Sequence, residues 1–231
     1  MLKTTDLEAV KTVAKTFLYF NLEENKDIPI FVDHPYTTSN IVSINNEIVN
    51  LLNSKYDLQK WRKYMEEVID SKENYNDFSY MITKPYRSAF FKHTYKYVNE
   101  TDLAKYLKYL WQTCNYVNQD INISRSEYVK LFKKCPKNVL MTEEELKVYE
   151  DLSDVITIYR GVNKVTNHPK DGLSWTTRLK TATWFANRYD KDEPTGTVYV
   201  AEIKKEDILA FFEYEKEILV NYKKLINLRT L

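Results

Sequence analysis

Glycine is scarce in this chain, and its scarcity excludes several kinds of active site. The 231 residues include three glycines, Gly161, Gly172 and Gly196, all of which lie after residue 150. A phosphate-binding loop needs several closely spaced glycines, and the Gly-x-Ser-x-Gly turn of many serine hydrolases needs a pair. Neither pattern occurs in the sequence. The glycine-free first 150 residues are instead typical of helices joined by short polar connections.

Cysteine and histidine are also few. Cys114 and Cys135 cannot make a disulfide framework, and we interpret both as reduced structural thiols. His34, His93 and His168 lie far apart and lack the spacing of metal ligands, so the sequence predicts no metal site.

Long apolar runs and an excess of charge are missing as well. No stretch approaches the ~18 apolar residues of a membrane span, and the N-terminal residues lack the apolar core of a signal peptide. The net charge of +1 gives no reason to expect nucleic acid or membrane as a partner. We therefore expect a cytoplasmic protein with no membrane partner. The cytoplasm would be that of the producing cell or of an infected cell.

Apolar residues recur at helical spacing through most of the first 141 residues. The predicted helices span 6–20, 48–69 and 102–117. Thr142 and Glu145 have the spacing of a capping box that opens a further short helix. The run 28–32 breaks the helical pattern and is expected to be a short strand or an extended segment. We expect a helical N-terminal region over 1–141 that recognises a target or supports the rest of the chain.

After Leu152 the pattern changes to short β-branched runs. The predicted strands span 155–159, 173–176, 197–203 and 217–220, with a fifth over 225–228. A helix is expected over 178–189, with Thr177 as its N-cap. The sequence thus predicts an α+β protein, in which the helical N-terminal region is followed by a mainly β unit over 142–231.

Three segments linked to these strands carry polar residues suited to chemistry. They are Tyr159-Arg160-Gly161-Val162, Gly172-Leu173-Ser174-Trp175-Thr176-Thr177 and the run from Phe212 to Val220, which contains Glu215 and Glu217. Taken singly, each has a plain structural explanation: a solvated arginine, the cap of a helix, and the solvated edge of a strand.

In this order, however, the segments resemble the Arg, Ser-x-Ser/Thr, Glu-x-Glu signature of the arginine-type mono-ADP-ribosyltransferases, and phage-encoded members are the most similar. Phe212, Glu215 and Glu217 also match the turn motif of that family. The resemblance covers about residues 142–228 and does not extend to the first 140. The chain departs from the common Ser-Thr-Ser pattern in having Trp175 and Thr176 after Ser174.

The resemblance implies a catalytic core of two small sheets packed around an NAD cleft, and an enzyme of the glycosyltransferase class that uses NAD as a substrate. Cleavage of NAD develops positive charge on the ribose, and a carboxylate beside it stabilises the transition state. By resemblance that carboxylate is Glu217, which Ser174 would hold in register with the ribose. Arg160 would bind the pyrophosphate, and Gly161 would admit the nicotinamide amide.

The remaining site residues follow from the same resemblance. Glu215 is associated with arginine as the acceptor side chain, and its spacing from Glu217 would point both the same way on an extended chain. Trp175 and Phe212 would line the pocket or touch the target, and Thr176 is a further expected contact of NAD. The protein target would be that of a phage or bacterial effector.

Two other functions share this fold, and one further partner is suggested by charge. The fold could serve an NAD glycohydrolase with water as acceptor, or a binding module without catalysis. Between Lys84 and Lys137 there are eleven Lys and Arg against four Asp and Glu, interleaved with aromatic residues, which could suit nucleic acid. Helices with apolar inner faces and solvated lysine outer faces explain this composition more simply.

Overall fold

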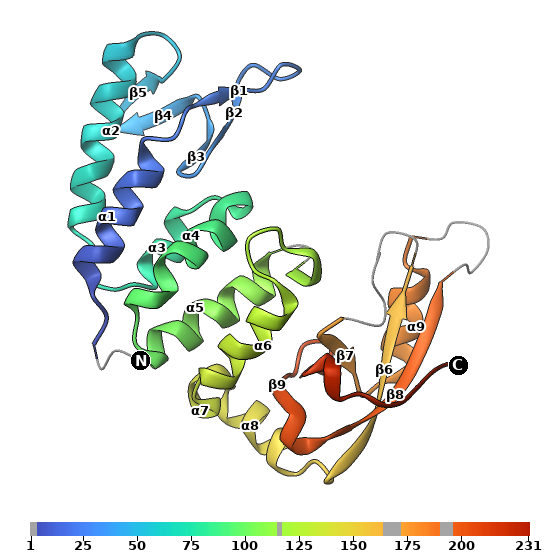
Figure 1. The fold of residues 1–231 in the computed structure, drawn as a ribbon. Helices are drawn as coiled ribbons and strands as arrows, with labels where there is room; N and C mark the ends of the chain where they lie inside the picture. Colours follow the sequence, from blue (N-terminus) through green and yellow to red (C-terminus); the bar gives the residue numbers. More distant parts are fainter. Residues whose placement is uncertain (1–3, 115–116, 164–171, 190–195) are drawn as a thin grey trace. The chain divides into compact units, whose positions relative to one another are not determined.

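The computed structural model describes residues 4–114, 117–163, 172–189 and 196–231. The chain divides into two compact units, residues 1–115 and 116–231, which are described separately (Figure 1). The sequence-based boundary at 141/142 marks a change in composition. Helices α6 (Arg125–Lys134) and α7 (Lys137–Leu140) precede that boundary and belong to the second unit. Among the described residues, no helix is both long enough and apolar enough to cross a membrane.

The first unit combines helices with small sheets. Its elements are α1 (Leu7–Leu18), β1 (Glu23–Glu24), β2 (Phe31–His34), β3 (Thr37–Ser39), β4 (Ile41–Ile44), β5 (Glu47–Asn50), α2 (Lys55–Asp70), α3 (Asp77–Met81), α4 (Arg87–Thr94) and α5 (Glu100–Thr113), with 3-10 turns η1 (Lys84–Tyr86) and η2 (Tyr95–Tyr97). Asp6 caps α1 by accepting the N–H of Ala9. Helices α1 and α2 lie side by side, and α4 also packs on α1.

The prediction of a helical N-terminal region is wrong over residues 23–50, apart from 28–32, where the predicted strand is confirmed by the start of β2 at Phe31. A three-stranded sheet, β1-β2-β3, and a hairpin, β4-β5, lie in this stretch. The helix predicted over 48–69 begins only at Lys55, because Ser54 caps it with its side chain and residues 47–50 are strand. Asn45 and Asn46 both have positive φ, which is the conformation that a tight hairpin turn requires. The apolar residue counted toward the helix, Ile48, is 78% exposed on this hairpin.

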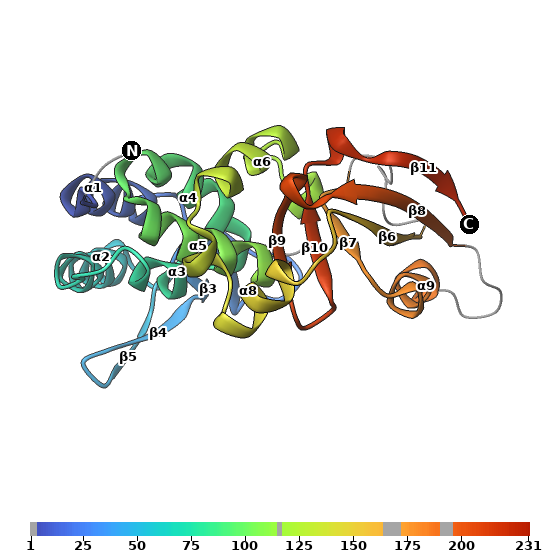
Figure 2. The same ribbon diagram turned by 90° about the horizontal axis from the view of Figure 1, so that it is seen from below.

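The second unit is built on one six-stranded antiparallel sheet. Its elements are η3 (Val117–Gln119), α6, α7, α8 (Glu143–Glu150), β6 (Val155–Val162), β7 (Ser174–Thr176), α9 (Leu179–Asn187), β8 (Thr197–Lys204), η5 (Lys205–Asp207), β9 (Ile208–Phe212), β10 (Glu217–Val220), η6 (Tyr222–Lys224) and β11 (Ile226–Thr230). The strand order is β11-β8-β6-β7-β10-β9. Helix α9 packs against β6 and β8 (Figure 2), and α6 and α8 pack against β9.

In place of the two packed sheets that the resemblance implies, the second unit has a single sheet. Among the described residues, the halves β11-β8-β6 and β7-β10-β9 are joined through β6 and β7 by one residue pair, Tyr159 and Thr176. The expectation of two separate sheets is therefore corrected to one sheet with a narrow link. The sequence did not show this link because one residue pair leaves no periodic pattern.

Most of the local predictions for the second unit are confirmed. The strands predicted over 155–159, 173–176, 197–203 and 217–220 appear as β6, β7, β8 and β10, and the Thr142–Glu145 capping box opens α8. Thr177 is not the N-cap of α9, however. The N-cap is Arg178, whose side chain makes no capping hydrogen bond. The backbone N–H of Arg178 donates to Thr176 Oγ1.

Candidate functional site

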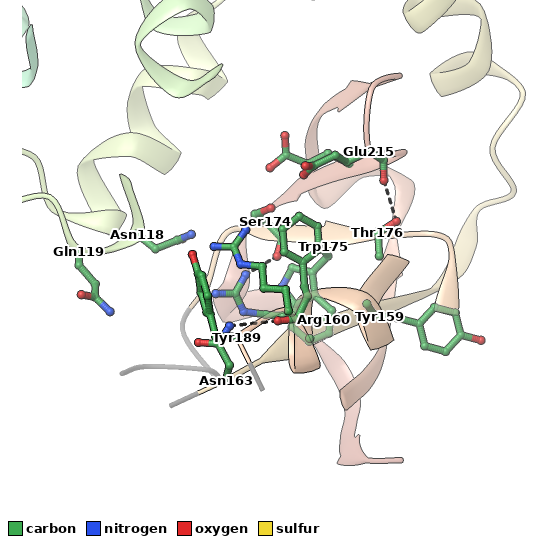
Figure 3. Close-up of a pocket in the computed structure, with 15 residues that line it drawn as sticks. Asn118, Gln119, Tyr159, Arg160, Asn163, Ser174, Trp175, Thr176, Tyr189 and Glu215 are labelled. Atoms are coloured by element: carbon green, nitrogen blue, oxygen red, sulfur yellow. Dashed lines mark hydrogen bonds between the residues drawn. The ribbon is translucent and has the colours of Figure 1, made fainter. Parts of the chain in front are cut away.

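A pocket in the second unit brings together seven of the eight residues predicted to form the site. Arg160, Gly161, Ser174, Trp175, Thr176, Glu215 and Glu217 all line it. The chain segments that supply them are β6, β7, the turn between β9 and β10, and the start of β10. In Figure 3 the side chains of Asn118, Arg160 and Tyr189 face a common space, whereas the ring of Tyr159 points away from it.

Arg160 forms the buried charged wall of this pocket. It is 8% exposed, and its Nη1 donates to the carbonyl oxygen of Ser174 at 2.5 Å (Figure 3). Burial lowers the pKa of Arg160 to about 10, and the charge of Glu217 opposes this shift. The guanidinium is therefore still charged at neutral pH. Its buried Nε has no hydrogen-bond partner among the described residues, so the group keeps donor capacity for an anion.

Strand β7 carries the Ser-x-Thr segment and is held at both ends. The buried Trp175 donates its indole N–H to the carbonyl oxygen of Gly172 at 3.0 Å. Thr176 Oγ1 donates to the backbone oxygen of Glu215 at 3.0 Å (Figure 3). The segment therefore joins the arginine side of the pocket, through Ser174, to the glutamate side, through Thr176.

Glu217 is the first residue of β10, where it lies between two neighbouring strands. It pairs with Thr176 of β7 on one side and with Phe212 of β9 on the other. Directly opposed residues of antiparallel strands place their side chains on one face, about 4.5–5.5 Å apart at Cβ. The sheet register thus fixes the carboxylate of Glu217 beside the threonine of the Ser-x-Thr segment.

Glu215 reaches the same pocket from a turn and not from a strand. The prediction that an extended chain carries both glutamates is therefore wrong, because residues 213–216 turn between β9 and β10 and Lys216 has a positive φ of 48°. Burial raises the pKa of Glu215, and the charge of Arg188 opposes the rise. Both carboxylates nevertheless line one pocket.

Phe212 is the predicted site residue that the structure places elsewhere. It is 2% exposed in β9, a strand buried at all of its positions, and it is not among the residues that line the pocket. The aromatic residue of the turn motif serves as part of the core here, because β9 is covered by α6 and α8.

Gly161 lines the pocket, but its immediate environment is a helix. A Cβ at this position would lie 2.6 Å from the backbone nitrogen of Ala186, and closer still to the carbonyl oxygen of Ala182. The absence of a side chain therefore allows α9 to pack directly on β6. This packing explains Gly161 without any ligand, in contrast to the nicotinamide contact that the resemblance implies.

Several pocket residues were not predicted from the sequence. Arg188 and Tyr189 follow the end of α9, and with Ala182 and Phe185 they continue one face of that helix toward the pocket. The helical spacing could have found them. Asn118 accepts the N–H of Leu173 at 2.8 Å and so holds the start of β7; nothing in the sequence marks it.

The charge pattern of the pocket suits a ligand that carries both signs of charge. The two carboxylates, Glu215 and Glu217, can stabilise a cation or accept a proton, and the two guanidinium groups, Arg160 and Arg188, suit phosphate oxygens. Within the described residues no cluster of three or more His, Cys, Asp and Glu side chains could hold a metal ion, and His168 lies outside those residues.

Comparisons with models of protein families, with curated proteins and with solved structures found no significant match to this chain.

Proposed function

We propose that the chain is a mono-ADP-ribosyltransferase that cleaves NAD and transfers ADP-ribose to a protein side chain, with arginine as the acceptor. The observation that carries the proposal is that Arg160, Ser174, Glu215 and Glu217, which come from three separate segments, line one pocket. The order of these residues in the sequence and the charge pattern of the pocket support the same chemistry.

The pocket has features that fit NAD as a substrate. The buried Nε of Arg160 lacks a partner in the described part of the chain, and a phosphate oxygen would supply one. The cavity of about 190 Å³ is smaller than the roughly 300–1,000 Å³ of typical small-molecule sites. A dinucleotide would therefore place one end in it, and the proposal assigns that place to the nicotinamide riboside end.

The proposed reaction balances as follows. The bond between ribose C1′ and the nicotinamide nitrogen breaks, and nicotinamide leaves with the bonding electrons. Glu217 stabilises the positive charge that develops on the ribose, which is the kind of interaction that accelerates a reaction. An acceptor nitrogen then bonds to C1′, and its proton passes to Glu215 or to water.

An NAD glycohydrolase is the second candidate, with water in place of the acceptor nitrogen. Glu215 favours the transferase, because a second carboxylate in the pocket suits a guanidinium acceptor. It does not decide between the two, since a carboxylate can also take a proton from an attacking water. The first unit is proposed to select the protein target, in the manner of a phage or bacterial effector.

Incubation with adenine-labelled NAD and a bacterial lysate tests the proposal. The wild-type chain is expected to label a protein, with mass spectrometry locating ADP-ribose on an arginine, and Glu217→Gln is expected to label nothing. Release of nicotinamide without any labelled protein, in several lysates and with the small guanidine agmatine as acceptor, would indicate the glycohydrolase. Neither labelling nor nicotinamide release would overturn both.

A further inference from the structure

The outer edge of β9 is covered by side chains of the α7–α8 region. Strand β9 ends the sheet, so no strand in the described part of the chain pairs with one row of its backbone groups. Lys137 Nζ donates to the carbonyl oxygen of Ile208 at 3.0 Å, and Met141 Sδ accepts the N–H of Phe211 at 3.3 Å. These contacts tie the start and the middle of β9 to the helices.

Glu145 of α8 makes the corresponding contact just beyond the end of β9. Its Oε1 accepts the N–H of Glu213 at 3.2 Å, while its Oε2 accepts the N–H of Thr142 at 2.9 Å. The residue is 7% exposed, so it is as buried as Arg160. The same carboxylate therefore caps its own helix with one oxygen and holds the chain at Glu213 with the other.

The residue held in this way begins the turn that carries the glutamates. Lys216 closes the turn by donating its N–H to Glu213 O at 3.1 Å, and its side chain forms an ion pair with Glu213. On the pocket side, Thr176 binds the backbone of Glu215 at 3.0 Å. The turn is thus fixed between β7 on one side and Glu145 on the other.

We propose that Glu145 is a positioning residue that sets the turn at 213–216 and, through it, the placement of Glu215 toward the acceptor. The inference rests on the proposed function, in which Glu215 handles the incoming guanidinium. Glu145 itself is not among the residues that line the pocket, so it acts through the turn. A charge-assisted bond to a backbone N–H is stronger than a neutral one, and it suits a fixed attachment of this kind.

Two substitutions separate this role from plain helix capping. Glu145→Gln replaces one carboxylate oxygen with an amide nitrogen, which cannot accept a hydrogen bond, and it removes the charge from the contact that remains. Thr142 Oγ1 accepts the N–H of Glu145 at 3.2 Å, which is the other half of the capping box. Thr142→Ala removes this hydrogen bond and leaves the contact between Glu145 and Glu213 in place. Glu144→Gln, an exposed position in the same helical turn, controls for the loss of charge.

The experiment measures, with the full chain, the rate of ADP-ribose transfer to agmatine and the rate of NAD hydrolysis at saturating NAD. Glu145→Gln is expected to lower transfer about tenfold while hydrolysis and the KM for NAD change by less than about threefold. Thr142→Ala and Glu144→Gln should keep the wild-type ratio of transfer to hydrolysis. An unchanged ratio in Glu145→Gln, or the same change of ratio in Thr142→Ala, would overturn the inference.

Hydrogen exchange at the Glu213 amide keeps the inference separate from the proposed function. In Glu145→Gln this amide is expected to exchange about tenfold faster, and in Thr142→Ala at the wild-type rate. If the wild-type chain cleaves no NAD, the proposed function fails, and this measurement still reports on the attachment of the turn. A Glu213 amide that is unprotected in the wild-type chain would overturn the attachment itself.

Discussion

The guanidinium of Arg160 lies against Gly172, in the space that a side chain at position 172 would need. A Cβ built on Gly172 would lie 2.6 Å from Nη2 of Arg160 and 2.5 Å from its Nε. The same guanidinium donates to the carbonyl oxygen of Ser174, two residues further along. The conformation of the buried arginine therefore depends on the absence of a side chain at position 172.

Gly172→Ala is expected to displace the guanidinium and weaken NAD binding. The clash is with the end of a side chain, which can move, so the stability should fall only modestly. The dissociation constant for NAD, measured by calorimetry, should rise about tenfold or more, because the variant would misplace the charged hydrogen bond that the proposal assigns to phosphate.

Gly161→Ala provides the matched comparison, because its Cβ would meet the backbone of Ala182 and Ala186, which cannot move independently. We expect this variant to lose about 1–3 kcal/mol of unfolding free energy in a denaturant titration, as overpacked cores do. If Gly172→Ala were the more destabilised of the two, with NAD affinity unchanged, the role given to Gly172 would be wrong.

Arg188 should set the acid limit of the transfer reaction. Burial raises the pKa of Glu215, and Arg188 lowers it. The proposed transfer needs Glu215 as a carboxylate, so the rate falls when the pH drops below the raised pKa of this group. The loss therefore occurs at a higher pH than it would with a glutamate of ordinary pKa. Arg188→Gln removes the opposing charge and should move the acid limb of transfer to a still higher pH.

The pH profile of kcat/KM for agmatine, measured between about pH 4 and 8, checks this expectation. Arg178→Gln is the control, since Arg178 is exposed and is not among the pocket residues. A limb that moves to lower pH in Arg188→Gln, or that moves equally in Arg178→Gln, would be inconsistent with the assigned interaction.

The second unit should fold as a fragment only if it includes α6 and α7. These helices bury Tyr128, Phe132 and Leu140, and Lys137 holds the edge of β9. We expect the fragment 116–231 to unfold cooperatively on heating and the fragment 142–231 to show no cooperative transition, because it would expose β9. Equal thermal transitions in the two fragments, followed by circular dichroism, would show that α6 and α7 are dispensable.

Local periodicity was sufficient to predict most elements that carry the site. β-branched runs located β6, β8 and β10, and an apolar face located α9. Strand β9 was not predicted, because all five of its residues are buried and a uniformly apolar run has no alternation to mark a strand. The hairpin at 41–50 was also missed, although its β-branched residues on either side of Asn45 and Asn46, which suit the positive φ of a tight turn, are visible in the sequence.

The sequence named most of the residues that line the pocket and predicted that Arg160, Ser174 and Glu217 converge, but it did not show which other residues join them. Residues that share a signature could be named one by one, whereas the contributions of Asn118 and Arg188 depend on how distant segments come together. The contact between Glu145 and Glu213 joins positions 68 residues apart, and the sequence shows only its capping half. Placing Phe212 in the core likewise required knowing that helices cover β9.

The most direct test of the central claim is the rate of nicotinamide release from NAD by the wild-type chain, Glu217→Gln and Glu215→Gln, with and without agmatine. Glu217→Gln keeps the size of the side chain and removes its charge, so release should fall about a hundredfold or more in both conditions. Glu215→Gln should lose the transfer to agmatine and keep much of the release without it. Nicotinamide release at the wild-type rate in Glu217→Gln would contradict the account.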